Sequence, residues 1–122
     1  MAINVNILAA TDVEGFIVNG AVTTSNQEPV DVPAGSVYKI NNIIIANIDG
    51  TNSATVTVSI STDNGSTYHA IASTVAVPAD ATLVVTDKNS ALYLDETDLL
   101  RIVGSADNDL TYTVSGEKIT DA

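Results

Sequence analysis

The chain has 122 residues, no cysteine, and a formal net charge of −11 from 15 acidic and four basic residues. This length suits one domain that folds around its own core, and the missing cysteines exclude disulfides, a thiolate nucleophile and a cysteine-based zinc site. A field this negative repels phosphate backbones, so we expect no nucleic-acid partner.

The composition favours β-strands, because Val, Ile and Thr supply 42 of the 122 residues. These side chains are stiff at χ1 and fit a pleated surface better than a helix. No window reaches the roughly 18 apolar residues that a membrane span needs, so we expect no membrane partner. The first ten residues have no basic segment and no continuous apolar run, so we expect synthesis in a cytoplasm without a signal peptide.

The first elements alternate between apolar and polar residues. Ile3, Val5 and Ile7 alternate with asparagines, so we assign residues 1–13 to an N-terminal strand or arm and residues 14–122 to a β-sandwich domain. The stretch Phe16–Val22 alternates in the same way. A bend should follow at residues 29–35, where two prolines and a glycine favour turn conformations.

The middle of the chain contains the clearest strands. Ile43–Ala46 is apolar on both faces, which is typical of a central strand covered on both sides or shielded by a partner. Thr55–Ser61 alternates strictly, so one face should be buried and the other solvated. Asp63–Gly65 follows, and its Asn-Gly pair predicts a tight hairpin turn.

The remaining strands are short and separated by acidic turns. Pro78 argues against a central ladder position for the residues before it, so Val75–Val77 should form an edge. We expect seven to nine strands in a single antiparallel β-sandwich, wound as a jelly roll or Ig-like. The further predicted strands are Leu83–Val85, Leu92–Leu94, Leu99–Val103 and Leu110–Val114, the last with a possible extension over Gly116–Ile119.

Catalytic chemistry is not visible in the sequence. His69 is the only histidine, and no nucleophile-elbow glycines stand near it. Most acidic residues lie in turns, where Asp side chains bond to the backbone, and not in a pair that would face across a glycosidase cleft. No glycine-rich phosphate loop is present. We therefore expect a protein that is not an enzyme and needs no cofactor.

Two binding hypotheses remain weak at this level. Asp95 and Asp98, and Asp107 and Asp109, gather hard oxygens that suit calcium, although neither pair has EF-hand spacing. We treat these four as weak calcium candidates and expect no metal otherwise. Tyr68 and Tyr93 could form an aromatic platform for a glycan if they were exposed together.

Several segments resemble small virion structural proteins of tailed bacteriophages. The similarity runs over residues 30–119 and includes Val32–Gly35 (VPAG), Ile43–Asn47 (IIIAN), Leu92–Ile102 (LYLDETDLLRI) and Val114–Gly116 (VSG). Asp80 stands where that family more often has glycine. The resemblance implies a β-sandwich subunit that decorates a particle and acts without chemistry.

From this resemblance we expect a capsid decoration (cement) protein, located on the virion after synthesis in the host cytoplasm. Its partners would be the major capsid protein or other virion proteins, and it would form a homo-oligomer, with a trimer favoured. The alternatives are a tail or neck component, or a receptor- or glycan-binding β-sandwich module. We also expect the N-terminal segment, residues 1–10, to pair with a neighbouring subunit or to dock on the shell, because free strand edges pair with other chains.

Overall fold

A computed structural model describes residues 10–121, with side chains for residues 12–120. It contains nine strands, within the seven to nine expected, and one 3-10 turn, η2, after Thr86. The bend expected at residues 29–35 is wrong at its start, because Pro29 lies inside strand β2, at a sheet edge where no amide donor is needed. The described residues include no helix long and apolar enough to cross a membrane. The elements are β1 (Ala10–Ala21), β2 (Gln27–Asp31), β3 (Ser36–Asn47), β4 (Ala54–Ser61), β5 (His69–Val77), β6 (Thr82–Thr86), η2 (Lys88–Ser90), β7 (Leu92–Leu94), β8 (Leu99–Gly104) and β9 (Leu110–Asp121).

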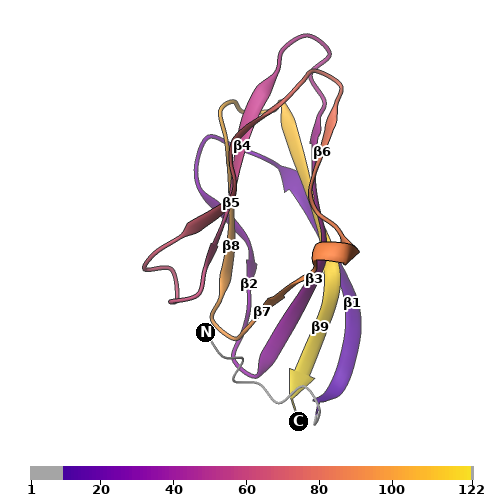
Figure 1. The fold of residues 1–122 in the computed structure, drawn as a ribbon, viewed down its shortest axis with the longest axis vertical. Coiled ribbons are helices and arrows are strands. Elements are labelled where there is room, and N and C mark those ends of the chain that lie inside the picture. Colours follow the sequence, from indigo (N-terminus) through magenta and orange to yellow (C-terminus); the bar gives the residue numbers. More distant parts are fainter. Residues whose placement is uncertain (1–9, 122) are drawn as a thin grey trace.

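The strands form two antiparallel sheets that face each other (Figure 1). Sheet A has the order β1-β9-β3-β6, with β7 also paired to β3, and sheet B has the order β2-β8-β4-β5. The pairs are therefore nested: β1 with β9, β2 with β8, β3 with β6 and β7, and β4 with β5. This nesting is a long hairpin rolled across two sheets, so the winding is that of a jelly roll and not Ig-like.

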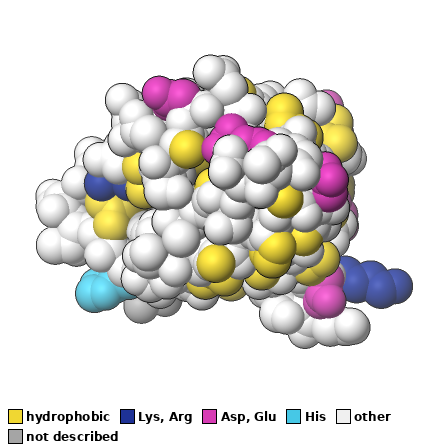
Figure 2. Space-filling model, turned by 90° about the horizontal axis from the view of Figure 1, so that it is seen from above, with side chains coloured by type: hydrophobic (Ala, Val, Ile, Leu, Met, Phe, Trp, Pro, Cys, Tyr) yellow, Lys and Arg dark blue, Asp and Glu magenta, His cyan; other side chains and the backbone are white. Residues whose placement is uncertain are grey.

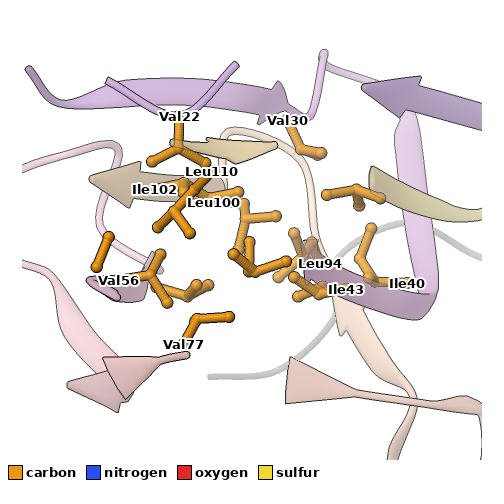
Figure 3. Close-up of a cluster of buried hydrophobic side chains, with 14 of the residues drawn as sticks. Val22, Val30, Ile40, Ile43, Val56, Val77, Leu94, Leu100, Ile102 and Leu110 are labelled. Carbon is orange, nitrogen blue, oxygen red and sulfur yellow. The ribbon is translucent and has the colours of Figure 1, made fainter. Parts of the chain in front are cut away.

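The core fills the space between the sheets with aliphatic side chains from both inner faces (Figure 3). Ile43 and Ile45 of β3 and Val114 of β9 are fully buried from sheet A, and Leu100 and Ile102 of β8 are fully buried from sheet B. Their alternation along each strand follows from the two-residue period of a pleated strand.

In β4 the inward positions of Val56 and Val58 are confirmed. The solvated face expected for the same strand is wrong at Ser59 and Ser61, which are 8% and 0% exposed, since the following loop folds back on Ser61 and its Gly65 amide donates to the Ser61 Oγ at 2.8 Å.

The predicted hairpin after β4 is confirmed. Asn64 and Gly65 have φ values of 59° and 88°, which is the left-handed region that an Asn-Gly turn supplies at low cost. The returning strand β5 is the edge of sheet B, as Pro78 indicated. Its register against β4 shifts twice, and Thr74, which lies at the shift between Val75 and Ala72, has a φ of 49°.

The expected boundary between an arm and the sandwich, after residue 13, lies inside β1. Asp12 and Val13 pair with Thr120 and Ile119 of β9. The physical reason is the length of β9, which continues to Asp121 and so offers ladder partners to the start of β1. The expectation that residues 1–10 pair with a neighbour falls on residues 1–9, which lie outside the described residues.

A β-bulge interrupts β3 where it crosses β9. Ile40 pairs with Gly116 and Asn42 pairs with Ser115, so Asn41 is an extra residue on β3. The bulge brings the β3 backbone so close to Gly116 that a Cβ there would lie 1.9 Å from the Lys39 carbonyl oxygen. Only glycine fits this approach.

Candidate interaction surfaces

The outer face of sheet A carries a broad uncharged area, which we call the neutral face. It is built from three rows of paired residues, and the members of each row point the same way because residues directly opposite in antiparallel strands share a face. None of the described side chains in it is charged. The rows are Ile17, Ser115 and Asn42; Asn19, Thr113, Ile44 and Val84; and Ala21, Thr111, Ala46 and Thr82.

The neutral face has a sharp lower boundary in the ladder. The next row holds Gly15, Glu117, Lys39 and Tyr93, where charges return and the Lys39 ammonium lies 5.9 Å from the Tyr93 ring centre. Between these rows is an open hollow of about 450 Å³, lined by Gly15, Phe16, Ile17, Asn41, Asn42, Ser115 and Gly116. The space above Gly15 is open, since a Cβ there would meet nothing closer than the Gly116 carbonyl oxygen at 3.9 Å.

Acidic loops crowd one end of the sandwich, where the β3–β4, β5–β6 and β8–β9 connections meet. Figure 2 looks onto this end and shows acidic side chains standing among uncharged ones. Hydrogen bonds from the Thr51 and Asn52 amides lower the pKa of Asp49. Burial, followed by the nearby Asp49 charge, raises the pKa of Asp109. Asp107 has a structural role, since its Oδ1 accepts a bond from the Thr24 amide at 2.9 Å.

Asp95 and Asp98 occupy the turn between β7 and β8, and each is about 1% exposed. The Asp98 Oδ2 accepts from the Asp95 amide at 2.9 Å, and the Asp95 Oδ1 accepts from the Glu96 amide at 2.8 Å. Burial raises the pKa of the Asp98 carboxyl, more than the hydrogen bond from Asp95 lowers it. The turn also binds the β2–β3 loop, because the Glu96 carboxylate accepts from the Gly35 amide at 2.9 Å.

The structure does not bring the four calcium candidates together. Asp98 directly precedes β8 and Asp107 follows it, so the two pairs stand at opposite ends of that strand. Among the residues that the structure describes, no group of three or more His, Cys, Asp or Glu side chains is placed to hold a metal ion. The hydrogen bonds of these turns give their carboxylates a structural role.

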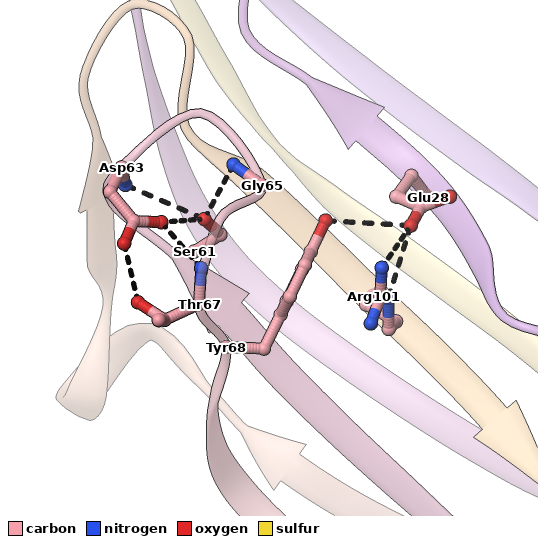
Figure 4. A network of polar contacts seen from close by, with 7 residues as sticks. All are labelled: Glu28, Ser61, Asp63, Gly65, Thr67, Tyr68 and Arg101. Atoms are coloured by element: carbon pink, nitrogen blue, oxygen red, sulfur yellow. Dashed lines mark hydrogen bonds and ion pairs between the residues drawn. The ribbon is translucent and has the colours of Figure 1, made fainter.

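The outer face of sheet B carries a polar cluster of Glu28, Tyr68 and Arg101 (Figure 4). The Arg101 guanidinium lies 3.5 Å from the Tyr68 ring centre, and its Nη2 lies 3.0 Å from the Glu28 Oε1. The Tyr68 hydroxyl donates to the same carboxylate at 3.4 Å. Burial raises the pKa of Tyr68, and the Arg101 charge opposes that shift.

The two tyrosines that could have formed a glycan platform are on different sheets. Tyr68 is half-buried beneath Arg101 outside sheet B, whereas Tyr93 is 45% exposed on the outer face of sheet A. A flat sugar-binding surface needs aromatic rings side by side, and these two do not provide it. His69 is exposed at the start of β5, where it pairs with Ile60.

Comparisons with known proteins support the fold. No protein-family model matches the sequence, and no curated protein matches it. A chain from Bacillus endospore appendages, a family of disulfide-linked pili, superimposes with a TM-score of 0.56 at 13% identity, covering 91% of this chain and 88% of its own. The protein described here has no cysteine, so it cannot share disulfide linkage.

Two structures of a pentameric capsid protein from metagenomic phage sequences superimpose less well. Their TM-scores are 0.40 and 0.39 at 15% identity, and the match covers 85% of this chain but 60% and 64% of theirs. Overlap this partial bears on neither fold nor function. The comparisons therefore show a shared β-sandwich fold with the appendage chain and nothing finer.

Sequence reasoning missed both surfaces as units. Ile44 alone could have been noticed in the sequence. Ile43–Ala46 is apolar on both faces of its strand, which suggested cover by a partner. In the structure Ile44 is half-buried on the neutral face. Glu28 and Arg101 carried no local signal, because they are 73 residues apart in the sequence and only the β2–β8 pairing brings them together.

Proposed function

We propose that this protein is a structural subunit of a tailed-phage virion, most specifically a capsid decoration protein whose neutral face lies on the assembled shell. One observation carries the proposal: charge is absent from this face of a chain with a net charge of −11. Depletion of charge marks the core of protein–protein interfaces.

The size of the neutral face suits a subunit that binds weakly by itself. Four strands about 4.8 Å apart and three rows about 7 Å apart give on the order of 400 Å². That is less than the roughly 800 Å² per partner of a stable one-to-one complex. Binding by many copies arranged by symmetry compensates for weak single contacts, and a protein that binds only the assembled shell stabilises it by mass action.

The resemblance of residues 30–119 to phage virion proteins is the source of the more specific assignment, and the jelly-roll fold agrees with it. The same argument admits a tail or neck component, which would use the same face on another virion protein. The separation of Tyr68 from Tyr93 disfavours a glycan-binding module. The particle location and the oligomeric state belong to the proposal.

The first test is the copy number of this protein relative to the major capsid protein in purified source particles, measured by quantitative mass spectrometry. A ratio near one supports shell-wide decoration. A ratio far below one indicates a location in the tail, the neck or a fibre. Absence of the protein from the particles overturns the proposal.

The second test uses co-sedimentation with shells that lack the protein. V84E places a charge on the neutral face, at a position 54% exposed, and should weaken binding at least about tenfold, because burying an unpaired carboxylate costs more than 1.4 kcal/mol. The matched control is I71E, which makes the same kind of change at a 43% exposed position on sheet B and should bind normally. Equal binding of both variants would show that another surface docks.

A further inference from the structure

Three of the four sheet edges are too short or too irregular to accept another strand. β2 has five residues, and Pro29 in its middle lacks an amide donor. β5 has two register shifts and a left-handed residue at Thr74. The β6 and β7 edge is split by η2 into pieces of five and three residues. Short, bulged and proline-bearing edges are the devices by which native sheets avoid pairing with other chains.

The fourth edge, β1, has none of these devices over most of its length. Asp12 to Ala21 run in unbroken register with β9, and within the described chain β1 pairs with no other strand. Its charged residues, Asp12 and Glu14, lie only at its beginning. From Gly15 to Ala21 the sequence GFIVNGA contains no charge and no proline, and Ile17 is 65% exposed. A long neutral edge strand is a template for a further strand. At its end the Ala21 carbonyl already accepts from the Gln27 side-chain amide at 3.1 Å.

We propose that this stretch pairs with the same stretch of a second copy, antiparallel, about a two-fold axis at Val18. A neutral segment brings two chains of net charge −11 into contact without opposing like charges. Pairing the seven neutral residues with themselves sets the register. Ile17 then lies opposite Asn19 of the second copy and Phe16 opposite its Gly20, while both acidic residues remain outside the paired stretch.

This pairing also enlarges the neutral face, a step that rests on the proposed function. In a continuous sheet with the two-fold axis perpendicular to it, the outer faces of both copies point the same way. Ile17, Asn19 and Ala21 lie in the β1 column of the neutral face, so the two faces meet along β1. The merged area is about twice the single one, roughly 800 Å², which is the contribution of one partner to a stable complex.

The test is the solution mass of the full chain by light scattering after size exclusion, in the absence of any particle. The wild type should show twice the mass of the chain. I17E/N19E should be monomeric, because each introduced carboxylate would oppose another across the two-fold axis. The matched control T82E/V84E introduces two acids at the same spacing on the other edge of sheet A and should remain dimeric. Circular dichroism should show that both variants are folded.

The register of the β1–β1 pairing can be tested by disulfide cross-linking. The chain contains no cysteine, so an introduced cysteine can pair only with another introduced one. Oxidation of an equal mixture of I17C and N19C should give a disulfide-linked heterodimer, because directly opposed residues have Cα atoms about 4.5–5.5 Å apart. Efficient linkage of I17C to itself would place the axis elsewhere and contradict the register.

A monomeric or trimeric wild type, or a dimer that survives I17E/N19E, overturns the pairing. None of these outcomes touches the proposed function, which depends on the protein's presence in particles and on V84E. Conversely, a dimer that is absent from particles would leave the pairing intact and remove the virion role.

Discussion

Gly116 offers the sharpest test of how sheet A is held together. In G116A the new methyl group would lie 1.9 Å from the Lys39 carbonyl oxygen and 2.9 Å from its carbon. Ordinary contact begins near 3.4 Å, so β3 and β9 must separate by about 1.5 Å at this point. That stretches the adjacent ladder hydrogen bonds beyond their useful range. Losing about two bonds and leaving buried groups unpaired should cost about 3–5 kcal/mol.

Chemical denaturation monitored by circular dichroism measures this cost as a change in the free energy of unfolding. G15A is the matched control on the neighbouring strand, since a Cβ at Gly15 meets nothing closer than the Gly116 carbonyl oxygen at 3.9 Å. It should change stability by less than about 1 kcal/mol, because alanine is the better strand residue. If G116A also costs less than 1 kcal/mol, the close approach at the bulge does not constrain the sheet and the reasoning fails.

Three further predictions concern charge. The Asp63 carboxyl should titrate near pH 2 by NMR, because hydrogen bonds from Thr67 and Ser61 lower its pKa to about 2 from 3.8. Its contribution to stability is therefore complete above pH 4 and is lost as the pH falls through 2. The T67V substitution removes one of these hydrogen bonds and should raise the midpoint of the Asp63 titration. R101A should lower the free energy of unfolding by about 1 kcal/mol, since the ion pair and ring contact on this partly exposed surface are each modest; a thermal shift above 10 °C would contradict that. Raising the salt concentration should tighten the dimer, because screening reduces the repulsion between two acidic chains, and sedimentation equilibrium at two ionic strengths would detect the opposite trend.

The fold was predictable where the decisive signals are local. Strict alternation placed β4, and the Asn64-Gly65 pair placed the hairpin that follows it. Pro78 correctly marked β5 as an edge. The choice between jelly-roll and Ig-like winding was not predictable, because it depends on which distant strands pair. The apolar and polar residues of each strand would alternate in the same way in either winding.

The candidate surfaces were less predictable for the same reason. The neutral face assembles residues from four strands, and no single strand shows it. The bulge at Asn41 has no sequence signature of its own, since the glycine that permits it lies on β9. In the acidic turns, by contrast, the sequence suggested a site that the structure does not form. Asp95 and Asp98 resemble ion ligands in the sequence, yet their oxygens accept backbone hydrogen bonds.

The pairing of β1 with β9 also sets the timing of folding. β1 is synthesised first among the described strands, yet its ladder partner in sheet A comes last. At about 5–20 residues per second, β1 waits on the order of 5–20 seconds on the ribosome before β9 exists. During that interval both edges of β1, including its uncharged stretch Gly15–Ala21, are open to neighbouring nascent chains. The order of translation therefore leaves β1 unpaired for longer than any other described strand. Cells that make this protein quickly should accumulate it in inclusion bodies more readily than cells that make it slowly.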